Sequence, residues 1–103
     1  MATPVRPEVL VDIELFSSDR GGRQGAILQG EYRGVLCVGK ESFSVRFLIS
    51  SPKGFAPGES ARVGVQFLAP EAALPHFPIG RAFEVWEGGV VGGGAVVAMA
   101  GNA

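Results

Sequence analysis

Cysteine and histidine are almost missing from this sequence, and their scarcity excludes several kinds of site. The 103 residues include one cysteine, Cys37, and one histidine, His76. One cysteine cannot form a disulfide within the chain, and one Cys with one His cannot supply the ligands of a zinc site. We expect no metal site, and we interpret Cys37, within the apolar run 35–38, as a buried strand residue. His76 is interpreted as a structural or solvent-exposed residue, with a place on a binding surface as the alternative.

The residue combinations that enzymes use are also lacking. His76 lies in a proline-rich stretch without a Gly-x-Ser-x-Gly turn elsewhere in the chain, so no base is placed beside a nucleophile. Asp12 and Glu14 share one face of a predicted strand, where water keeps both carboxylates ionised. The glycine-rich run 87–94 is followed by a predicted strand, whereas a phosphate-binding loop opens a helix. We therefore predict that the protein is not an enzyme, with no catalytic residue, no cofactor and no bound nucleotide.

Long apolar runs and an excess of either charge are absent too. No stretch approaches the roughly 18 apolar residues of a membrane span, and the first seven residues lack the apolar core of a signal peptide. Nine Lys and Arg against ten Asp and Glu leave a formal net charge of -1, so no overall field attracts nucleic acid or anionic lipid. We expect a soluble, cytoplasmic protein with no membrane partner.

The residues that are abundant describe one β domain. Apolar residues make up 47% of the chain and charged residues 18%, a balance typical of a folded domain. Sixteen glycines and seven prolines interrupt any helical period, and short runs alternate between apolar and polar residues. The predicted strands are 9–16, 32–38, 43–49, 61–68, 82–87 and 93–99, with one short helical turn at 71–74. Six strands favour a single closed antiparallel β-barrel over residues 8–99, because closure removes exposed strand edges. Residues 1–7 and 100–103 are expected to be frayed ends.

Two places in the chain are candidate binding surfaces. Arg20, Arg23 and Arg33 form the densest basic group, around a turn that also contains Gly22. Three guanidinium groups near one turn could pair with phosphates or with a partner's carboxylates, and an ordinary solvated turn is the alternative. Trp86 follows Val85 in a predicted strand, and successive side chains of a strand point to opposite faces. If Val85 faces the core, the ring of Trp86 points outward, where tryptophan often anchors a partner.

Three segments, read in order, carry a family resemblance. Residues 18–23 read Ser-Asp-Arg-Gly-Gly-Arg, residues 57–59 read Pro-Gly-Glu, and residues 83–97 read Phe-Glu-Val-Trp-Glu-Gly-Gly-Val-Val-Gly-Gly-Gly-Ala-Val-Val. Together they resemble the third, C-terminal β-barrel domain of elongation factor Tu, whose segments read close to Glu-Glu-Gly-Gly-Arg, Pro-Gly-Asp and Phe-Ala-Ile-Arg-Glu-Gly-Gly-Arg-Thr-Val-Gly-Ala-Gly-Val-Val. The resemblance covers about residues 8–99 and implies a six-stranded antiparallel barrel, occurring here as a stand-alone domain.

The departures from the family concern its closing hairpin. Trp86 and Val90 stand where the family has an arginine on each side of Glu-Gly-Gly, whose acid is Glu87 here. In the family this domain contacts the T stem of aminoacyl-tRNA, the GTPase domain and the exchange factor. The resemblance implies that residues 21–23 and the segment 86–94 lie at or near such surfaces. The replaced arginines imply a rewritten interface. No Gly-x-x-x-x-Gly-Lys-Ser/Thr motif occurs, so GTP hydrolysis is excluded.

Three functions therefore compete. The first is a protein-binding adaptor or competitor connected with translation, acting through the altered hairpin. The second is binding of RNA, tRNA in particular, through Arg20, Arg23 and Arg33. The third is a structural barrel that self-associates as a homo-oligomer.

Overall fold

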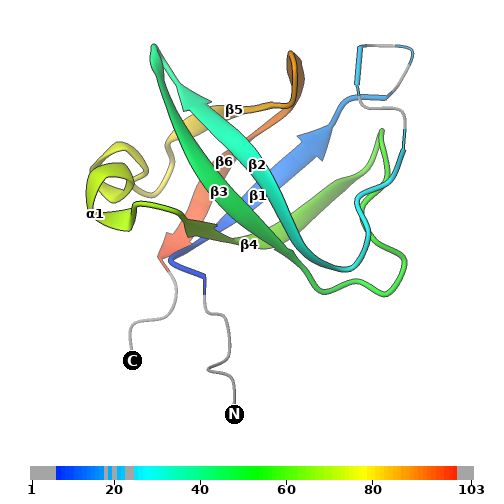
Figure 1. The fold of residues 1–103 in the computed structure, drawn as a ribbon, viewed down its shortest axis with the longest axis horizontal. Helices are drawn as coiled ribbons and strands as arrows, with labels where there is room; N and C mark the ends of the chain where they lie inside the picture. The colour runs from blue at the N-terminus through cyan, green and yellow to red at the C-terminus, as the bar shows by residue number, and fades with distance from the viewer. Residues whose placement is uncertain (1–6, 18, 20, 23–24, 100–103) are drawn as a thin grey trace.

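Alternation along each strand gives the sheet one apolar face, and the sheet closes around it. The computed structural model describes residues 7–17, 19, 21–22 and 25–99. Its strands are β1 (Val9–Leu15), β2 (Gly30–Val38), β3 (Glu41–Ile49), β4 (Ser60–Phe67), β5 (Ala82–Trp86) and β6 (Val90–Met99). Neighbours pair antiparallel in the order β1-β4-β3-β2-β5-β6, and β6 returns to β1 (Figure 1). The structure confirms the all-β, six-stranded closed barrel expected from the sequence.

The barrel is filled by apolar side chains from all six strands and from three connecting segments. Inward positions follow the strand period of two, as in β1, where Val9, Val11, Ile13 and Leu15 are all buried. No polar or charged side chain among the described residues is buried. The interior is therefore a packed hydrophobic core without a polar site inside it.

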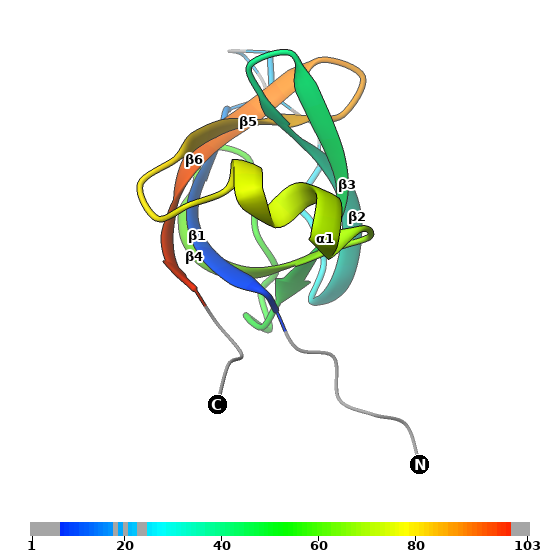
Figure 2. The ribbon, with the colours of Figure 1, turned by 90° about the vertical axis from the view of Figure 1, so that its left-hand side faces the viewer.

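A short helical segment covers one mouth of the barrel. Helix α1 (Pro70–Ala73) and the 3-10 helix η2 (Leu74–His76) lie across the opening (Figure 2), close to the turn expected at 71–74. They deliver Phe77 into the core, where it is 0% exposed. Its ring centroid lies 4.8 Å from that of Phe67, 5.6 Å from that of Phe43 and 6.2 Å from that of Phe83. This ring closes the mouth by joining three strands.

The connections at the far end of the barrel are tied by one isolated bridge. The backbone N–H of Ile27 donates to the carbonyl of Phe55 at 2.8 Å, and the N–H of Phe55 donates back at 2.7 Å. Both side chains are buried. The loops at this end therefore contribute to the core as well as connecting strands.

The seam between β1 and β6 explains several glycines of the closing hairpin. Val9 lies opposite Met99 and Leu15 opposite Gly92, so the first and last strands are direct neighbours. A Cβ at Gly94 would lie 1.9 Å from the carbonyl oxygen of Asp12. Because this oxygen belongs to the backbone, no side-chain movement could relieve the clash. The glycines at this seam permit close approach of two backbones.

The closing hairpin is shorter than the sequence suggested. β6 begins at Val90, where residue 93 was expected, because residues 87–89 supply the turn, with φ of 69° at Gly88 and 155° at Gly89. The later glycines of the run belong to the strand. The expected frayed ends, 1–7 and 100–103, lie outside the described residues except for Pro7.

Cys37 lies on the outer face of the sheet and is only half-buried, so its interpretation as a core residue was wrong. The strand period decides its position, because its neighbours Leu36 and Val38 take the inward places. Partial burial raises the pKa of the Cys37 thiol above its ordinary value of 9.0, and the negative charge of Glu84 opposite it adds to this effect. Such a thiol is less reactive than a free one at neutral pH.

Candidate binding surface

A line of exposed apolar side chains crosses the outside of the barrel. Trp86 on β5 lies opposite Val90 on β6 and opposite Val35 on β2. Val35 in turn lies opposite Ser44 on β3, whose carbonyl accepts a 3.0 Å hydrogen bond from the N–H of Leu68. Side chains directly opposite on antiparallel strands point to the same face. We call the line of Val90, Trp86, Val35 and Leu68, interrupted by Ser44, the apolar row.

The apolar row is unusual because large hydrophobic side chains in it remain in contact with water. Leu68 is 73% exposed, Trp86 45% and Val90 40%, while Val35 is half-buried between its neighbours. Single exposed apolar residues are normal on proteins, whereas several of them on neighbouring strands are typical of an interaction site. The outward direction predicted for Trp86 is thereby confirmed.

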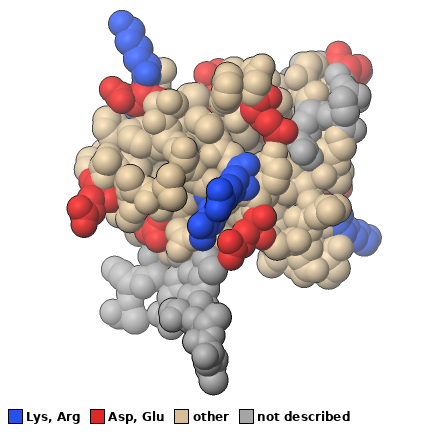
Figure 3. Space-filling model, in the orientation of Figure 1, with Lys and Arg blue, Asp and Glu red and all other residues tan. Residues whose placement is uncertain are grey.

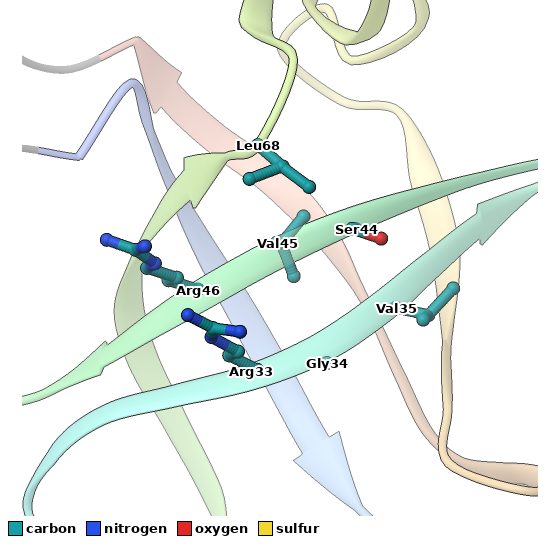
Figure 4. Close-up of a pocket in the computed structure, with 7 residues that line it drawn as sticks. All are labelled: Arg33, Gly34, Val35, Ser44, Val45, Arg46 and Leu68. Carbon is teal, nitrogen blue, oxygen red and sulfur yellow. The ribbon is translucent and has the colours of Figure 1, made fainter.

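Positively charged side chains lie beside the apolar row, two residues away from Val35 on β2 and from Ser44 on β3. Arg33 on β2 lies directly opposite Arg46 on β3, and Gln66 on β4 lies opposite Arg46. Both guanidinium groups extend to the same side of the sheet (Figure 4), and a basic patch is visible over β2 and β3 on this face of the molecule (Figure 3). We call Arg33 and Arg46 the arginine pair. Like charges directly opposite one another destabilise a sheet, so this arrangement is unfavourable in the free protein.

One carboxylate compensates the arginine pair only in part. Glu31 lies 3.7 Å from a guanidinium nitrogen of Arg46, with both side chains partly exposed. No ion pair joins Arg33 to any residue in the described part of the chain. The pair therefore retains positive charge beside an apolar surface.

A shallow groove of about 330 Å³ separates the arginine pair from the end of the apolar row (Figure 4). Its lining consists of Arg33, Gly34, Val35, Ser44, Val45, Arg46 and Leu68. Most of the exposed lining is apolar, with the two guanidinium groups along one side. A groove of this kind can accept an apolar group that carries an anion near it.

The remaining hairpin residue in this region, Glu87, is fixed by the barrel. The hydroxyl of Tyr32 on β2 donates a hydrogen bond to the Glu87 carboxylate, and the Tyr32 ring stacks on Phe47 with centroids 6.2 Å apart. The N–H of Glu87 also donates to the carbonyl of Gly89 at 2.8 Å. Glu87 therefore holds the hairpin against β2, which keeps Trp86 and Val90 in place.

The structure brings some of the residues predicted from sequence together and separates others. Arg33 on β2, Trp86 on β5 and Val90 on β6 all lie on the outside of the barrel, on three successive strands, and Glu87 lies in the turn between β5 and β6. Arg20 and Arg23 lie outside the described residues. Gly22 is buried, and a Cβ there would lie 1.9 Å from the carbonyl oxygen of Phe16, so close backbone packing accounts for this glycine.

Three residues of this surface were not among the predicted site residues. Arg46, Val35 and Leu68 line the groove, and each is ordinary when read alone. The signal that could have found them is the register of β2 against β3, which a two-residue turn at 39–40 fixes with Val38 opposite Glu41. The strands expected at 32–38 and 43–49 would place Val38 opposite Phe43 and Arg33 opposite Leu48, so the opposition of Arg33 and Arg46 could not be found from them.

A fully paired arginine elsewhere on the barrel provides a contrast. Arg62 on β4 donates to both carboxylate oxygens of Asp12 on β1, at 2.8 and 3.3 Å. Its guanidinium group holds the pKa of Asp12 below the ordinary value of 3.8, chiefly through the hydrogen bond. The cross-strand partner of Arg62 is an acid, whereas that of Arg33 is another arginine.

Replacing Asp12 with asparagine should alter the acid end of the stability profile. Folding lowers the pKa of Asp12, so the ion pair stabilises the protein above the unfolded pKa, and this stabilisation is lost as pH falls through the folded pKa. At neutral pH the wild type should unfold at a slightly higher urea concentration than Asp12→Asn. This difference should disappear well below pH 3.8. Urea titrations at both pH values test this, and a difference that does not change with pH would contradict it.

Comparison with family models gives no match for this chain, and comparison with curated proteins gives none either. Neither helix in the described part of the chain is long and apolar enough to cross a membrane. Among the described residues, no group of three or more His, Cys, Asp or Glu could hold a metal ion.

Proposed function

We propose that the protein is a non-catalytic binding module that recognises another protein through the apolar row. The observation that carries this proposal is the alignment of Val90 on β6, Trp86 on β5 and Val35 on β2, which Leu68 at the end of β4 continues beyond Ser44 on β3. Val90, Trp86 and Leu68 are exposed. Protein interfaces have an apolar centre in which Trp and Arg are enriched, and a few such residues supply most of the affinity. Trp86 would be the anchor of this interface.

The resemblance to the third domain of elongation factor Tu suggests the setting of this interaction. The three matching segments and the six-stranded antiparallel barrel support an adaptor or competitor role connected with translation, in the cytoplasm. The hairpin residues Trp86 and Val90, which replace the family's arginines, lie in the apolar row. A changed partner, or a changed mode of binding to an old one, would follow from that replacement.

Site-specific cross-linking would test the proposal. The photoreactive residue p-benzoylphenylalanine would replace Val90 in the apolar row, and in a matched control it would replace Leu28, which is 77% exposed outside the row. We expect the probe at position 90, and not that at 28, to cross-link one protein in cells. Adding Trp86→Ala should reduce the yield strongly, since truncating a central tryptophan costs about 2 kcal/mol or more.

The competing functions give different products in the same experiment. Cross-links to tRNA would support nucleic-acid binding through Arg33 with Arg20 and Arg23, and cross-links to a second copy of the chain would support self-association. Either result, or equal products from positions 90 and 28, would contradict a protein-binding row.

A further inference from the structure

We propose that the arginine pair binds an aspartate or glutamate side chain of the partner protein, while an apolar side chain of the same partner segment lies in the groove against Val35 and Leu68. This inference rests on the proposed function, and it adds the chemistry of the partner. The segment recognised would be acidic and apolar, with the two features close together in sequence.

The charges of the arginine pair favour binding of an anion, because the two guanidinium groups repel each other. Arg33 and Arg46 face one another across β2 and β3, and Glu31 reaches only Arg46, at 3.7 Å. A carboxylate between two guanidinium groups accepts charge-assisted hydrogen bonds from both and removes their mutual repulsion. The free protein therefore holds an unfavourable charge arrangement that a bound acid would relieve.

The spacing of the surface matches the spacing of side chains along an extended chain. Arg33 and Val35 are two residues apart on β2, as are Ser44 and Arg46 on β3, so the arginine pair and the apolar row are separated by about 6.8 Å. Residues two positions apart in an extended peptide have the same separation. A segment of the form acid-x-apolar could thus place its acid at the arginine pair and its apolar side chain in the groove of about 330 Å³.

The surrounding charges favour a protein segment over a nucleic acid. Glu31 lies beside the arginine pair, and Glu84 lies one position beyond the apolar row, opposite Cys37. These acids would repel RNA, because its backbone carries a negative charge at every phosphate. A peptide segment with one carboxylate would place its negative charge at the arginine pair alone.

The test uses two peptides that differ by one charge. The full chain, labelled with ¹⁵N, would be titrated with acetyl-Gly-Asp-Gly-Leu-Gly-amide and with the same peptide carrying Asn in place of Asp, and amide shifts would be followed by NMR. We expect the Asp peptide to shift the amides of Arg33, Val35, Ser44 and Arg46 with a dissociation constant of about 1 mM, as for a single small contact. The Asn peptide should bind about fivefold or more weakly, because it loses the charge-assisted bonds.

Matched variants separate the arginine pair from general electrostatics. Arg33→Gln and Arg46→Gln should each abolish the preference for the Asp peptide, and their dispersed amide spectra would show that the barrel is intact. Lys53→Gln removes one exposed cation outside the groove and should leave the preference unchanged. Raising the salt concentration should weaken binding of the Asp peptide more than that of the Asn peptide.

Failure of this inference can be distinguished from failure of the proposed function. Equal binding of the two peptides, or no shifts from either, would overturn the acid-binding role of the arginine pair. Shifts of the same amides by tRNA without any by the Asp peptide would overturn it in favour of nucleic acid. The cross-link from position 90 does not depend on the arginine pair, so a specific cross-linked protein with any of these results would leave the proposed function standing.

Discussion

Replacing Phe77 with alanine should lower the free energy of unfolding by about 3 to 5 kcal/mol, the range for removing a fully buried aromatic ring. The ring is 0% exposed and contacts the rings of Phe67, Phe43 and Phe83. Its loss would leave a cavity between three strands and α1. Because a domain of this size is typically stable by only about 5 to 15 kcal/mol, the variant should be marginally folded.

Urea denaturation followed by the fluorescence of Trp86 would measure this change. The matched control is Ile79→Ala, which removes an apolar side chain two residues away that is 63% exposed. The control should change stability by less than about 0.5 kcal/mol, as for other surface substitutions. Equal effects of the two substitutions would show that the Phe77 ring does not close the mouth of the barrel as described.

Replacing Gly94 with alanine should destabilise the barrel by about 3 kcal/mol, although it adds only one methyl group. The new Cβ would lie 1.9 Å from the carbonyl oxygen of Asp12 and 2.9 Å from the carbonyl carbon of the same residue. Both are backbone atoms in the seam between β1 and β6, so relief requires the two strands to separate. Separation would break hydrogen bonds of the ladder that joins β6 to β1.

The control for this substitution has the opposite expected sign. A Cβ at Gly25 meets nothing within 4 Å, and the φ of this residue is not positive. Gly25→Ala should therefore leave stability unchanged or raise it by up to about 1 kcal/mol, by restricting the unfolded chain. Thermal and urea unfolding of both variants would test the pair, and a neutral Gly94→Ala would mean that β1 and β6 approach less closely than this seam requires.

The number of strands and their inward residues could be predicted because they depend on local patterns. Val11, Ile13 and Leu15 alternate with Asp12 and Glu14, and this period of two decides which face is buried. Glycine and proline positions then separate the strands. Six mostly antiparallel strands favour a closed barrel, because closure removes their exposed edges.

The binding surface could not be predicted to the same extent, because it depends on register between strands that are distant in sequence. Trp86 was expected to point outward from its own strand alone. Its alignment with Val35, and the opposition of Arg33 to Arg46, depend on how β5, β2 and β3 pair. Leu68 was assigned to a strand that ends one residue earlier, and its exposure follows from that ending.

Cys37 illustrates how a continuous apolar run misleads. Residues 35–38 read as uniformly buried, yet only Leu36 and Val38 enter the core, while Val35 and Cys37 occupy the outer face. In a sheet covered on one side only, such a run places apolar side chains where water reaches them. Here the outer members of the run contribute to the apolar row or lie next to it.

The pairing of β1 with β6 also determines how the barrel would respond to a pulling force. Val9 lies opposite Met99, so a force applied at these two ends acts across the ladder and not along it. The hydrogen bonds between β1 and β6 would then break one pair after another, starting at Val9 and Met99. The domain should therefore unfold at low force when it is pulled from both ends, although the β1–β6 ladder stabilises the barrel in the absence of force.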